Sequence, residues 1–579
     1  MFQIMLCSTV RKLATKRSSR LPGALRGLTG ASSAGLRLKL AVKANWWRLV
    51  LLVFLVVYAA ALLLNLGYMS FQWDEMPHMN GALLLSRGQA GEYMTQYGYY
   101  PPLYDIVTTG FFQLFGIGAT SGRLAAVAFS LLAIWIVFEF VNRVYGAKIA
   151  LVSSLMLGTM PGFFWLSRVA MLETMLIFFF SLTLFFVFTW LSDKKDKTLI
   201  LSGLALGVGF LAKYQIVVAG LVMIAGILLL GRHRLKWRFS RFLLVPLVAA
   251  LVVVPWLVVL FQSSGLSSFG SLLNTISGGH AERLDYSARF PLPIFYLIEV
   301  TWPFPDLPVH PISLFVYVLG LLGLGLWAWR RNPADKFFLA WFGLVYVFFT
   351  LLPNKQWRYV TPLFPVLAIS AASFVFFVYG RIGAVWKSGR LSLSEHRVRQ
   401  VVAALFIVLV ASAVVDSSYD AYQMTARDQI HIPLEETANY LAGHMSLNQS
   451  AVIVCAFNLL DQDMLRFYLP ANMSLDQVWQ YPELAVDATT PNFNITEFVS
   501  LCQQRNVKYL ILYDYGANTP FYNTTLTYSD VTQLIYATGK FGYTGDEPFF
   551  GDMLNYRTFL VGFRQAYNLE PLTNSSLGP

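Results

Sequence analysis

Charged residues are scarce in this chain. Only 13% of its 579 residues are Asp, Glu, Lys or Arg, whereas an average soluble domain carries about 25%. Hydrophobic residues make up 56% of the sequence, which is more apolar surface than a water-soluble fold can hide. The composition therefore excludes an ordinary soluble domain and predicts an α-helical, polytopic membrane protein.

Cysteine is also scarce, with only Cys7, Cys455 and Cys502 in the whole chain. Three cysteines cannot form a disulfide framework, and these three do not have the spacing of metal ligands. At most Cys455 and Cys502 pair, if their compartment is oxidising.

Acidic residues are absent from the first 44 residues, which are rich in Lys, Arg, Ser, Gly and Ala. A transit peptide has a similar composition, but the long apolar stretch that follows favours a basic cytoplasmic tail over residues 1–45. The net charge of +12 does not indicate nucleic-acid binding, because the Lys and Arg residues cluster in short stretches between apolar runs. This clustering is typical of the positive charge that orients membrane proteins.

About eleven apolar stretches are candidates for membrane spans. They are 46–66, 121–141, 149–166, 172–191, 198–212, 214–230, 242–261, 311–329, 337–352, 359–379 and 400–417. The two short stretches on either side of Lys213 could instead be half-penetrating helices, which would return the chain to the same side. With the N-terminus inside and the C-terminus outside, the basic loops all fall inside, as the positive-inside rule requires.

This topology gives the transmembrane domain, residues 46–417, two large external loops. The first, 67–120, contains the short apolar segment 103–117 with Asp105 and Gln113, which we interpret as an interfacial helix lying along the membrane. If this segment crossed the membrane, every later loop would change sides. The second loop, 262–310, is too long for a simple connector.

Residues 418–579 have the composition of a small extracytoplasmic α/β domain of about 160 residues, a usual domain size. Runs at 451–456, 509–513 and 558–563 predict strands, and Asn494 to Gln504 predicts a capped helix. Five glycosylation sequons lie here and nowhere else, at Asn448, Asn472, Asn494, Asn523 and Asn574. They favour an external location, because N-glycosylation needs a translocated compartment.

Several charged residues lie at the outer ends of the predicted spans. They are Asp74, Glu75, Arg168, Glu173, Lys213, Lys355 and Arg358. Charges near the bilayer tend to be paired or functional. Acidic turns and several cations on one face suit an anionic lipid headgroup and a reacting hydroxyl. Simpler interpretations are solvated loop acids, an Arg168–Glu173 ion pair, a snorkelling Lys213, and membrane anchoring by Lys355 and Arg358.

Five motifs occur in one order along the chain. They are Trp73-Asp74-Glu75, Tyr100-Pro101-Pro102-Leu103-Tyr104, the turn from Ser167-Arg168 to Glu173, Gly203 to Lys213, and Lys355-Gln356-Trp357-Arg358-Tyr359. Over about residues 46 to 380, the series resembles the protein mannosyltransferase and aminoarabinose transferase superfamily. These are polyprenyl-phosphate-sugar glycosyltransferases of the GT-C fold. Eukaryotic protein mannosyltransferases carry an additional lumenal β-trefoil, for which this chain has no room, so a prokaryotic type in the plasma membrane is expected.

The resemblance implies transfer of a sugar from a polyprenyl-phosphate donor to a protein, glycan or lipid acceptor, with inversion at the anomeric carbon. Asp74 matches the position of the candidate general base, with Glu75 supporting the loop or the acceptor. Glu173 matches a second acidic position that could orient the acceptor or Asp74. Lys213, Lys355 and Arg358, together with Arg168, would hold the donor phosphate.

Some residues depart from the family pattern or have more than one interpretation. Tyr100 stands where some relatives have Lys, and His78 stands where an aromatic residue is common. His280, Glu282 and Asp285 of the second loop could line an acceptor or metal site, or simply lie on the loop surface. A divalent cation between Asp74 and Glu173 is conceivable, although no His/Asp ligand spacing supports it.

Two other classes of function compete with a glycosyltransferase. A secondary transporter or lipid flippase with an external sensor domain would place charges at the bilayer midplane and often show inverted repeats. Here the middles of the spans are almost free of charge and no internal repeat is apparent. A structural or adhesion scaffold would not explain why acidic and basic residues share the external loops.

Overall fold

The computed structural model describes residues 30–231, 239–264, 289–302, 310–387, 395–427, 431–454, 461–470, 472–482, 493–512, 526–543, 549–550, 562–563 and 566–569. The chain divides into two units, Met1–Val56 and Val57–Pro579. The long helix α2 (Gly30–Leu63) begins in the first unit and ends in the second. All of the contacts below lie within the second unit.

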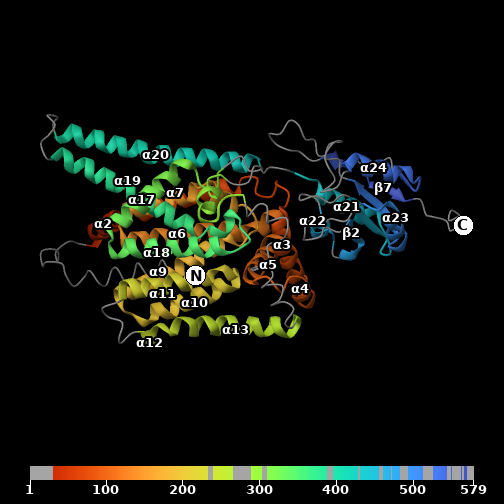
Figure 1. The fold of residues 1–579 in the computed structure, drawn as a ribbon, viewed down its shortest axis with the longest axis horizontal. Coiled ribbons are helices and arrows are strands. Elements are labelled where there is room, and N and C mark those ends of the chain that lie inside the picture. The colour runs from red at the N-terminus through yellow and green to blue at the C-terminus, as the bar shows by residue number, and fades with distance from the viewer. Residues whose placement is uncertain are drawn as a thin grey trace. The chain divides into compact units, whose positions relative to one another are not determined.

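Helices make up the region up to residue 427 (Figure 1). After α2 come α3 (Met76–Ser86), α4 (Ala90–Gln96), α5 (Leu103–Phe115), α6 (Ala119–Val144), α7 (Ala147–Thr159), α8 (Pro161–Leu166), α9 (Glu173–Asp193), α10 (Asp196–Ala212), α11 (Val217–Gly231), α12 (Phe239–Phe242) and α13 (Leu244–Ser264). They are followed by α16 (Phe295–Glu299), α17 (Leu314–Arg330), α18 (Pro333–Leu351), α19 (Leu363–Lys387) and α20 (Glu395–Arg427). Helix α9 packs on α6 and α10, α10 packs on α13, and α17 packs on α19.

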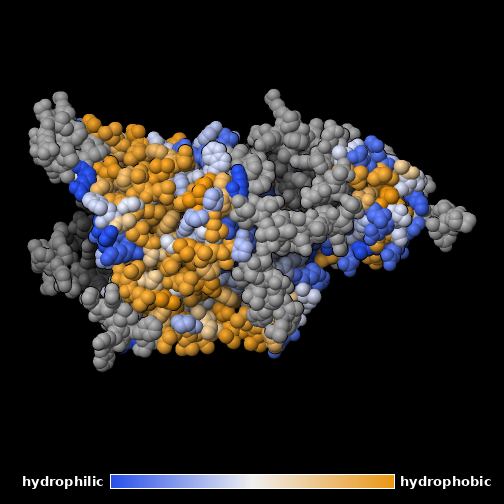
Figure 2. Space-filling model, viewed as in Figure 1, coloured by the Kyte–Doolittle hydropathy of each residue, from blue (hydrophilic) through white to orange (hydrophobic). Residues whose placement is uncertain are grey.

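Among the described residues, seven helices are long and apolar enough to cross a membrane. These segments are 46–63, 119–144, 173–193, 244–263, 333–351, 363–381 and 403–423, and shorter apolar helices occupy 147–159, 214–230 and 314–330. On the face drawn in Figure 2, hydrophobic residues cover much of the helical region, as expected where lipid replaces water. The helical, multi-pass membrane protein is thus confirmed, while the number of eleven spans stays a prediction.

Helix breaks fall at the outer ends of two predicted spans. The stretch 149–166 is two helices, α7 and α8, because Pro161 disfavours the helical conformation for Met160, which is extended with ψ 126°. The boundary at Lys213 is confirmed: this residue is extended, with φ −158° and ψ 126°, between α10 and the short 3₁₀ helix Tyr214–Ile216. The break at Lys213 places its side chain beside Glu173 at the start of α9.

The segment 103–117 forms helix α5, with Tyr104, Asp105, Thr108 and Phe112 on its buried face. Ile106, Leu114 and Phe115 are exposed on the other side. This two-sided distribution suits an interfacial helix, although its position relative to a bilayer remains a prediction.

The described residues after 431 form an α/β fold. Its sheet has the order β2 (Val478–Tyr481), β1 (Ser450–Val454), β3 (Val507–Leu512), β7 (Ala566–Leu569) and β4 (Phe541–Tyr543). The first three strands are parallel, and β7 runs antiparallel to both of its neighbours. The helices are α21 (Leu434–His444), α22 (Gln462–Tyr468), α23 (Ile495–Gln504) and α24 (Tyr528–Ala537), and β5 (Phe549–Phe550) pairs with β6 (Gly562–Phe563). The strands predicted at 451–456 and 509–513 correspond to β1 and β3.

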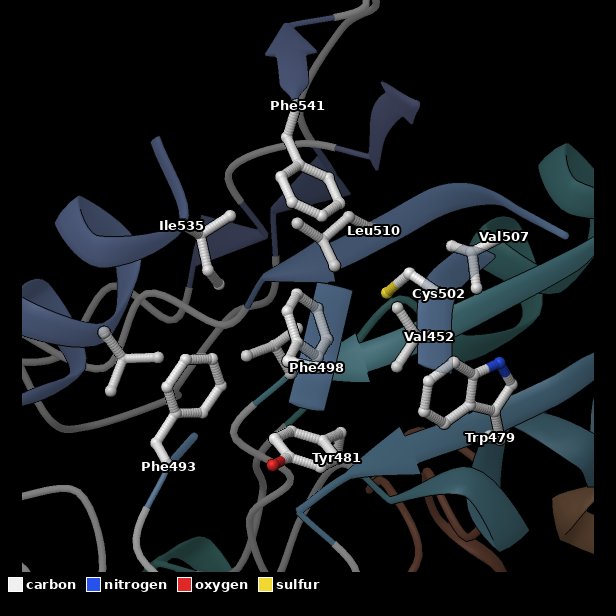
Figure 3. Close-up of a cluster of buried hydrophobic side chains, with 12 residues drawn as sticks. Val452, Trp479, Tyr481, Phe493, Phe498, Cys502, Val507, Leu510, Ile535 and Phe541 are labelled. Atoms are coloured by element: carbon white, nitrogen blue, oxygen red, sulfur yellow. The ribbon is translucent and has the colours of Figure 1, made fainter. Parts of the chain in front are cut away.

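An apolar core lies on one side of this sheet (Figure 3). Phe498 and Cys502, one helical turn apart on α23, face Val452 of β1 and Leu510 of β3. The predicted helix cap is confirmed, since the Asn494 Oδ1 accepts hydrogen bonds from the backbone N–H groups of Thr496 and Glu497 at 3.1 and 3.2 Å. Cys502 is buried and forms no disulfide within the described residues, and its suggested partner Cys455 lies outside them.

Candidate active site

The loop before α3 folds so that its adjacent carboxylates point in different directions. Residues Trp73–Glu75 form a 3₁₀ turn that leads directly into α3, with Pro77 in the first turn of that helix. The Gln72 N–H donates to Glu75 Oε2 at 2.8 Å, which closes the turn. The side chain of Asp74 is 51% exposed, whereas Glu75 is fully buried. Asp74 is therefore the carboxylate of the pair that a substrate can reach.

Glu75 is held by a fully buried ion pair with Arg123 of α6. Arg123 Nε and Nη2 donate to its two carboxylate oxygens, both at 2.9 Å. The backbone N–H of Ala170, in the turn before α9, donates to Glu75 Oε1 at 2.6 Å. With the bond from Gln72, four donors satisfy this carboxylate, so it ties the first loop to α6 and to the turn 167–172. This geometry supports the loop-supporting role for Glu75 over a chemical one.

Arg123 is a residue that the sequence analysis missed. Its guanidinium also donates to the carbonyl oxygens of Leu66, Met69 and Ser70, at 2.8, 2.8 and 3.1 Å. One buried cation thus organises the whole loop before Asp74. The available signal was an arginine at the start of an otherwise apolar span, where an unpaired charge is costly.

Asp74 forms an ion pair with Arg358, its Oδ2 lying 2.5 Å from the guanidinium Nη2. Arg358 belongs to the 3₁₀ turn Trp357–Val360 between α18 and α19, and it also donates to Gln356 Oε1 at 2.9 Å. Burial by itself would lower the pKa of Arg358, but the carboxylates of Asp74 and Glu173 outweigh that effect and raise it. Arg358 therefore stays charged and interacts with both acids.

Glu173 forms the second ion pair of the site, with Lys213. The Lys213 Nζ lies 2.7 Å from Glu173 Oε1. Glu173 is the buried first residue of α9, where the helix dipole favours a carboxylate. Lys213 occupies the extended break between α10 and α11. Asp74, Arg358, Glu173 and Lys213 consequently form a series of alternating charges, which we call the charge series.

Arg168 and Lys355 were predicted as phosphate ligands, and both make other contacts here. Arg168 Nη1 donates to the carbonyls of Ala61 and Leu62 at 3.2 and 2.6 Å, at the end of α2, and burial lowers its pKa to about 10. Lys355 Nζ donates to the Leu352 carbonyl at 2.6 Å and lies 6.0 Å from the ring centre of Phe295. Burial lowers the pKa of Lys355 as well. The suggested Arg168–Glu173 pair is replaced by Glu173–Lys213.

His78, one helical turn after Asp74, is part of a buried hydrogen-bonded cluster. Its Nδ1 lies 2.9 Å from Asp105 Oδ1, and the Tyr93 hydroxyl donates to Asp105 Oδ2 at 3.0 Å. Burial raises the pKa of Asp105, while His78 opposes that shift. Gly81 makes room for the carboxylate, because a Cβ there would meet Asp105 Oδ2 at 2.8 Å. The cluster joins α3 to α5.

Tyr100 packs edge-on against His78, with 5.1 Å between ring centres, and its ring lies tilted against that of Tyr99 at 4.3 Å. Burial raises the pKa of its hydroxyl, and the nearby charges of Asp74 and Asp105 raise it further. Tyr100, at the position where some relatives have a lysine, thus lies beside the His78–Asp105 cluster.

The other candidate residues from the sequence, in the second long loop and at the sequons, add little to the site. His280, Glu282 and Asp285, and the sequon residues Asn523 and Asn574, lie outside the described residues. Asn448, Asn472 and Asn494 are exposed. Within the described part of the chain, His, Cys, Asp and Glu side chains do not gather in groups of three or more that could hold a metal ion, so the conceivable divalent cation has no ligand set there.

Comparison with known proteins gives consistent matches. The family model of dolichyl-phosphate-mannose-protein mannosyltransferase matches residues 100–259. A curated relative from Edwardsiella ictaluri, the undecaprenyl phosphate-alpha-4-amino-4-deoxy-L-arabinose arabinosyl transferase, is 25% identical over 312 residues, 52% of this chain and 51% of the relative. The chain spans about half the length of the curated relatives that it matches.

Solved structures of ArnT from Cupriavidus metallidurans share the fold. The apo form has a TM-score of 0.58 and 18% identity, covering 81% of this chain and 93% of that chain. The form bound to undecaprenyl phosphate has a TM-score of 0.55 and 16% identity, covering 93% of this chain and 100% of that chain. The family model and the curated relative thus point to sugar transfer from polyprenyl-phosphate donors as the activity of similar proteins, and the solved structures show that this chain shares their fold.

Proposed function

We propose that this protein transfers a sugar from a polyprenyl-phosphate donor to a hydroxyl group of a protein, glycan or lipid on the extracytoplasmic face, with inversion. The observation that carries the proposal is the charge series, in which an exposed carboxylate, Asp74, contacts a cation that also interacts with the Glu173–Lys213 pair. The solved ArnT complex with undecaprenyl phosphate supports the class of donor lipid.

Asp74 is the general base of the proposed reaction. The acceptor oxygen attacks the anomeric carbon from the face opposite the phosphate, and the bond from that carbon to the phosphate oxygen breaks. Its electron pair leaves with the phosphate, while the acceptor proton moves to Asp74. A carboxylate suffices as the base, because the hydroxyl becomes acidic only as its bond to the sugar forms. Asp74 suits this role because its side chain is half exposed and close to cations.

Arg358 and Lys213 stabilise the departing phosphate, since fixed cations near a developing negative charge favour the transition state. Both are paired with carboxylates in the present structure. A phosphate carries acceptor oxygens that suit the Arg guanidinium well, so donor binding would draw Arg358 from Asp74. The freed carboxylate could then accept a hydrogen bond from the acceptor, which implies that the donor binds before the acceptor.

The same proposal assigns a location to each part of the chain. Residues 1–45 would be a cytoplasmic tail, 46–417 the membrane-embedded catalytic domain, and 418–579 an extracytoplasmic domain of a plasma-membrane protein. Charge placement favours an enzyme over a transporter: Glu173 begins α9, Lys213 lies between α10 and α11, and Arg358 lies between α18 and α19. Transporter sites instead lie near the bilayer midplane.

The direct test follows the fate of a labelled donor lipid. Full-length protein in vesicles would be given undecaprenyl-phosphate mannose or undecaprenyl-phosphate 4-amino-4-deoxy-L-arabinose, with a bacterial membrane extract as the acceptor source. The proposal predicts release of free undecaprenyl phosphate and a glycosylated product of inverted anomeric configuration for a donor that the enzyme accepts. Movement of intact donor across the bilayer without cleavage would favour the flippase alternative and contradict the proposal.

A further inference from the structure

Helix α22 of the C-terminal fold packs its aromatic residues on the loop that carries Asp74. Phe71, three residues before Asp74, is fully buried. Its ring centre lies 5.0 Å from that of Phe467 in an edge-on arrangement, and 5.7 Å from that of Tyr468 in a stacked one. Phe112 of α5 approaches Phe467 at 6.0 Å. Aromatic pairs at these distances each contribute about 0.5–1.5 kcal/mol beyond the area they bury.

Polar contacts reinforce the packing on both sides of Phe71. The Ile432 N–H donates to Ser70 Oγ at 2.6 Å, and His431 stacks on Tyr68 with 5.0 Å between ring centres. Further along the loop, Asn80 Nδ2 donates to the Asp463 carbonyl at 3.0 Å. Arg87 Nη2 donates to the Leu469 carbonyl at 2.8 Å. The contacts therefore span residues 68–87, with Asp74 between them.

Phe71 also connects α22 to the charge that organises the loop. The Arg123 guanidinium lies 5.4 Å from the Phe71 ring centre, within the range of a cation–π contact. Arg123 in turn binds Glu75 and three backbone carbonyls before Asp74. A displacement of α22 would thus reach Asp74 through Phe71, Arg123 and Glu75.

Helix α22 is itself firmly attached to the C-terminal sheet. The Asp461 side chain caps it by accepting a hydrogen bond from the Met464 N–H at 2.8 Å. Arg466 Nε donates to the carbonyls of Leu475 and Val478, both at 2.9 Å, which joins α22 to the start of β2. The helix can therefore transmit the position of the sheet to the loop.

We infer that α22, together with His431 and Ile432, is a positioning clamp that holds Asp74 in its productive place, with Phe467 as the central residue. The inference rests on the proposed function, because that function makes Asp74 a base whose position matters. A base must lie within hydrogen-bond reach of the acceptor proton, and a misplacement of about 1 Å can cost about 100-fold in rate. Loop segments are generally more mobile than the elements that they connect, so the contacts of α22 add restraint to the position of Asp74.

The test uses the Phe467→Ala and Phe467→Leu variants of the full-length protein in vesicles. The matched control is Leu447→Ala, at a side chain of the same fold that is 78% exposed. With undecaprenyl-phosphate mannose or aminoarabinose as the donor, we expect kcat of Phe467→Ala to fall about 10-fold to 100-fold with donor KM nearly unchanged. Phe467→Leu should recover part of the loss, and the control should match the wild type.

Hydrogen–deuterium exchange provides a readout that needs no substrate, so the clamp can fail independently of the proposed function. In Phe467→Ala, the backbone amides of residues 68–75 should exchange faster than in the wild type. The amides in the interior of α9 should exchange at the wild-type rate. An unchanged kcat, a change confined to donor KM, or wild-type exchange over residues 68–75 would each overturn the clamp. If Phe467→Ala does not fold, the same criteria apply to Phe467→Leu. If neither donor is consumed by the wild type, the proposed function fails while the exchange result still decides the clamp.

Discussion

Adjacent carboxylates in this protein have different environments, and the proposed function therefore gives them different roles. Glu75 is fully buried and accepts hydrogen bonds from Arg123 and two backbone N–H groups. Asp74 is half exposed and forms one end of the charge series, paired with Arg358. The difference arises from the 3₁₀ turn, which directs the two side chains apart. At the scale of single residues, burial and the number of donors separate a structural acid from a chemical one.

Breaking the Glu75–Arg123 ion pair should mainly lower the stability of the folded protein. Removal of one partner from a buried ion pair typically costs about 3–5 kcal/mol, because the remaining charge stays buried. We therefore expect Glu75→Gln to lower the unfolding temperature and the yield of folded protein. Glu92→Gln, at a partly exposed acid on α4 that is not in an ion pair among the described residues, should leave both close to the wild-type values. Thermal unfolding in detergent measures the effect, and a wild-type melting temperature for Glu75→Gln would contradict it.

The role of Arg358 should depend on the planar shape of its guanidinium group as well as on its positive charge. Its guanidinium donates to Asp74 and Gln356 together, and lysine cannot reproduce that planar fork. Hydrogen bonds to charged groups contribute about 1.5–3 kcal/mol, so Arg358→Lys should lower kcat/KM for the donor by about 10-fold to 100-fold. Steady-state kinetics with a polyprenyl-phosphate sugar tests this, and full activity of the lysine variant would show that only the charge is needed.

At the scale of elements, the site depends on where helices end. Lys213 and Met160 are extended breaks, and Glu173 begins α9. These boundaries follow from local signals in the sequence, such as Pro161, so the presence of Glu173, Lys213 and Arg358 in one region could be anticipated. The Arg123 pair and the His78–Asp105 bond could not, because they join residues 48 and 27 positions apart whose contact depends on tertiary packing.

Short helix α16 carries a carboxyl group with an unusual environment. Glu299 is fully buried, and neither of its oxygens has a hydrogen-bond partner among the described residues. Burial raises its pKa to about 8. Because the folded state favours the protonated form, this group contributes stability below its ordinary pKa near 4.5, and that contribution is lost as the pH rises through about 8.

We therefore expect the wild-type unfolding temperature to fall as the pH increases from about 5 to about 9. The Glu299→Gln variant, which cannot ionise at this position, should show a shallower fall, whereas Glu92→Gln should follow the wild type. If the unfolding temperature falls with pH equally steeply in the wild type and in Glu299→Gln, the Glu299 carboxyl does not contribute to the pH dependence of stability.

At the scale of the whole molecule, the fold class was accessible from composition and from the spacing of apolar stretches. The helical membrane fold and the parallel strands β1 and β3 agree with those patterns. The attachment of α22 to the first loop was not accessible, because it joins residues nearly four hundred positions apart, as in the Asn80–Asp463 contact with a separation of 383. Such contacts depend on the surfaces that the folded elements present, which no local pattern encodes.

The predicted orientation in the membrane can be tested by labelling introduced cysteines from either side. Cysteines introduced at Ala90 and Leu447 should react with an impermeant thiol reagent from outside, and one at Lys195 should react only from inside. These three positions are exposed, so burial does not limit the reaction. Labelling of Lys195→Cys from outside would place α5 across the membrane and reverse the later loops.

The central claim is that Asp74 is the base of a sugar-transfer reaction on a polyprenyl-phosphate donor. Its most direct test compares turnover by wild type, Asp74→Asn and Glu92→Gln in vesicles with the same donor. General-base catalysis typically contributes about 100-fold to 10,000-fold. We expect Asp74→Asn to remain folded and to lose at least about 100-fold in kcat, while Glu92→Gln keeps the wild-type rate. Normal turnover by folded Asp74→Asn would contradict the account.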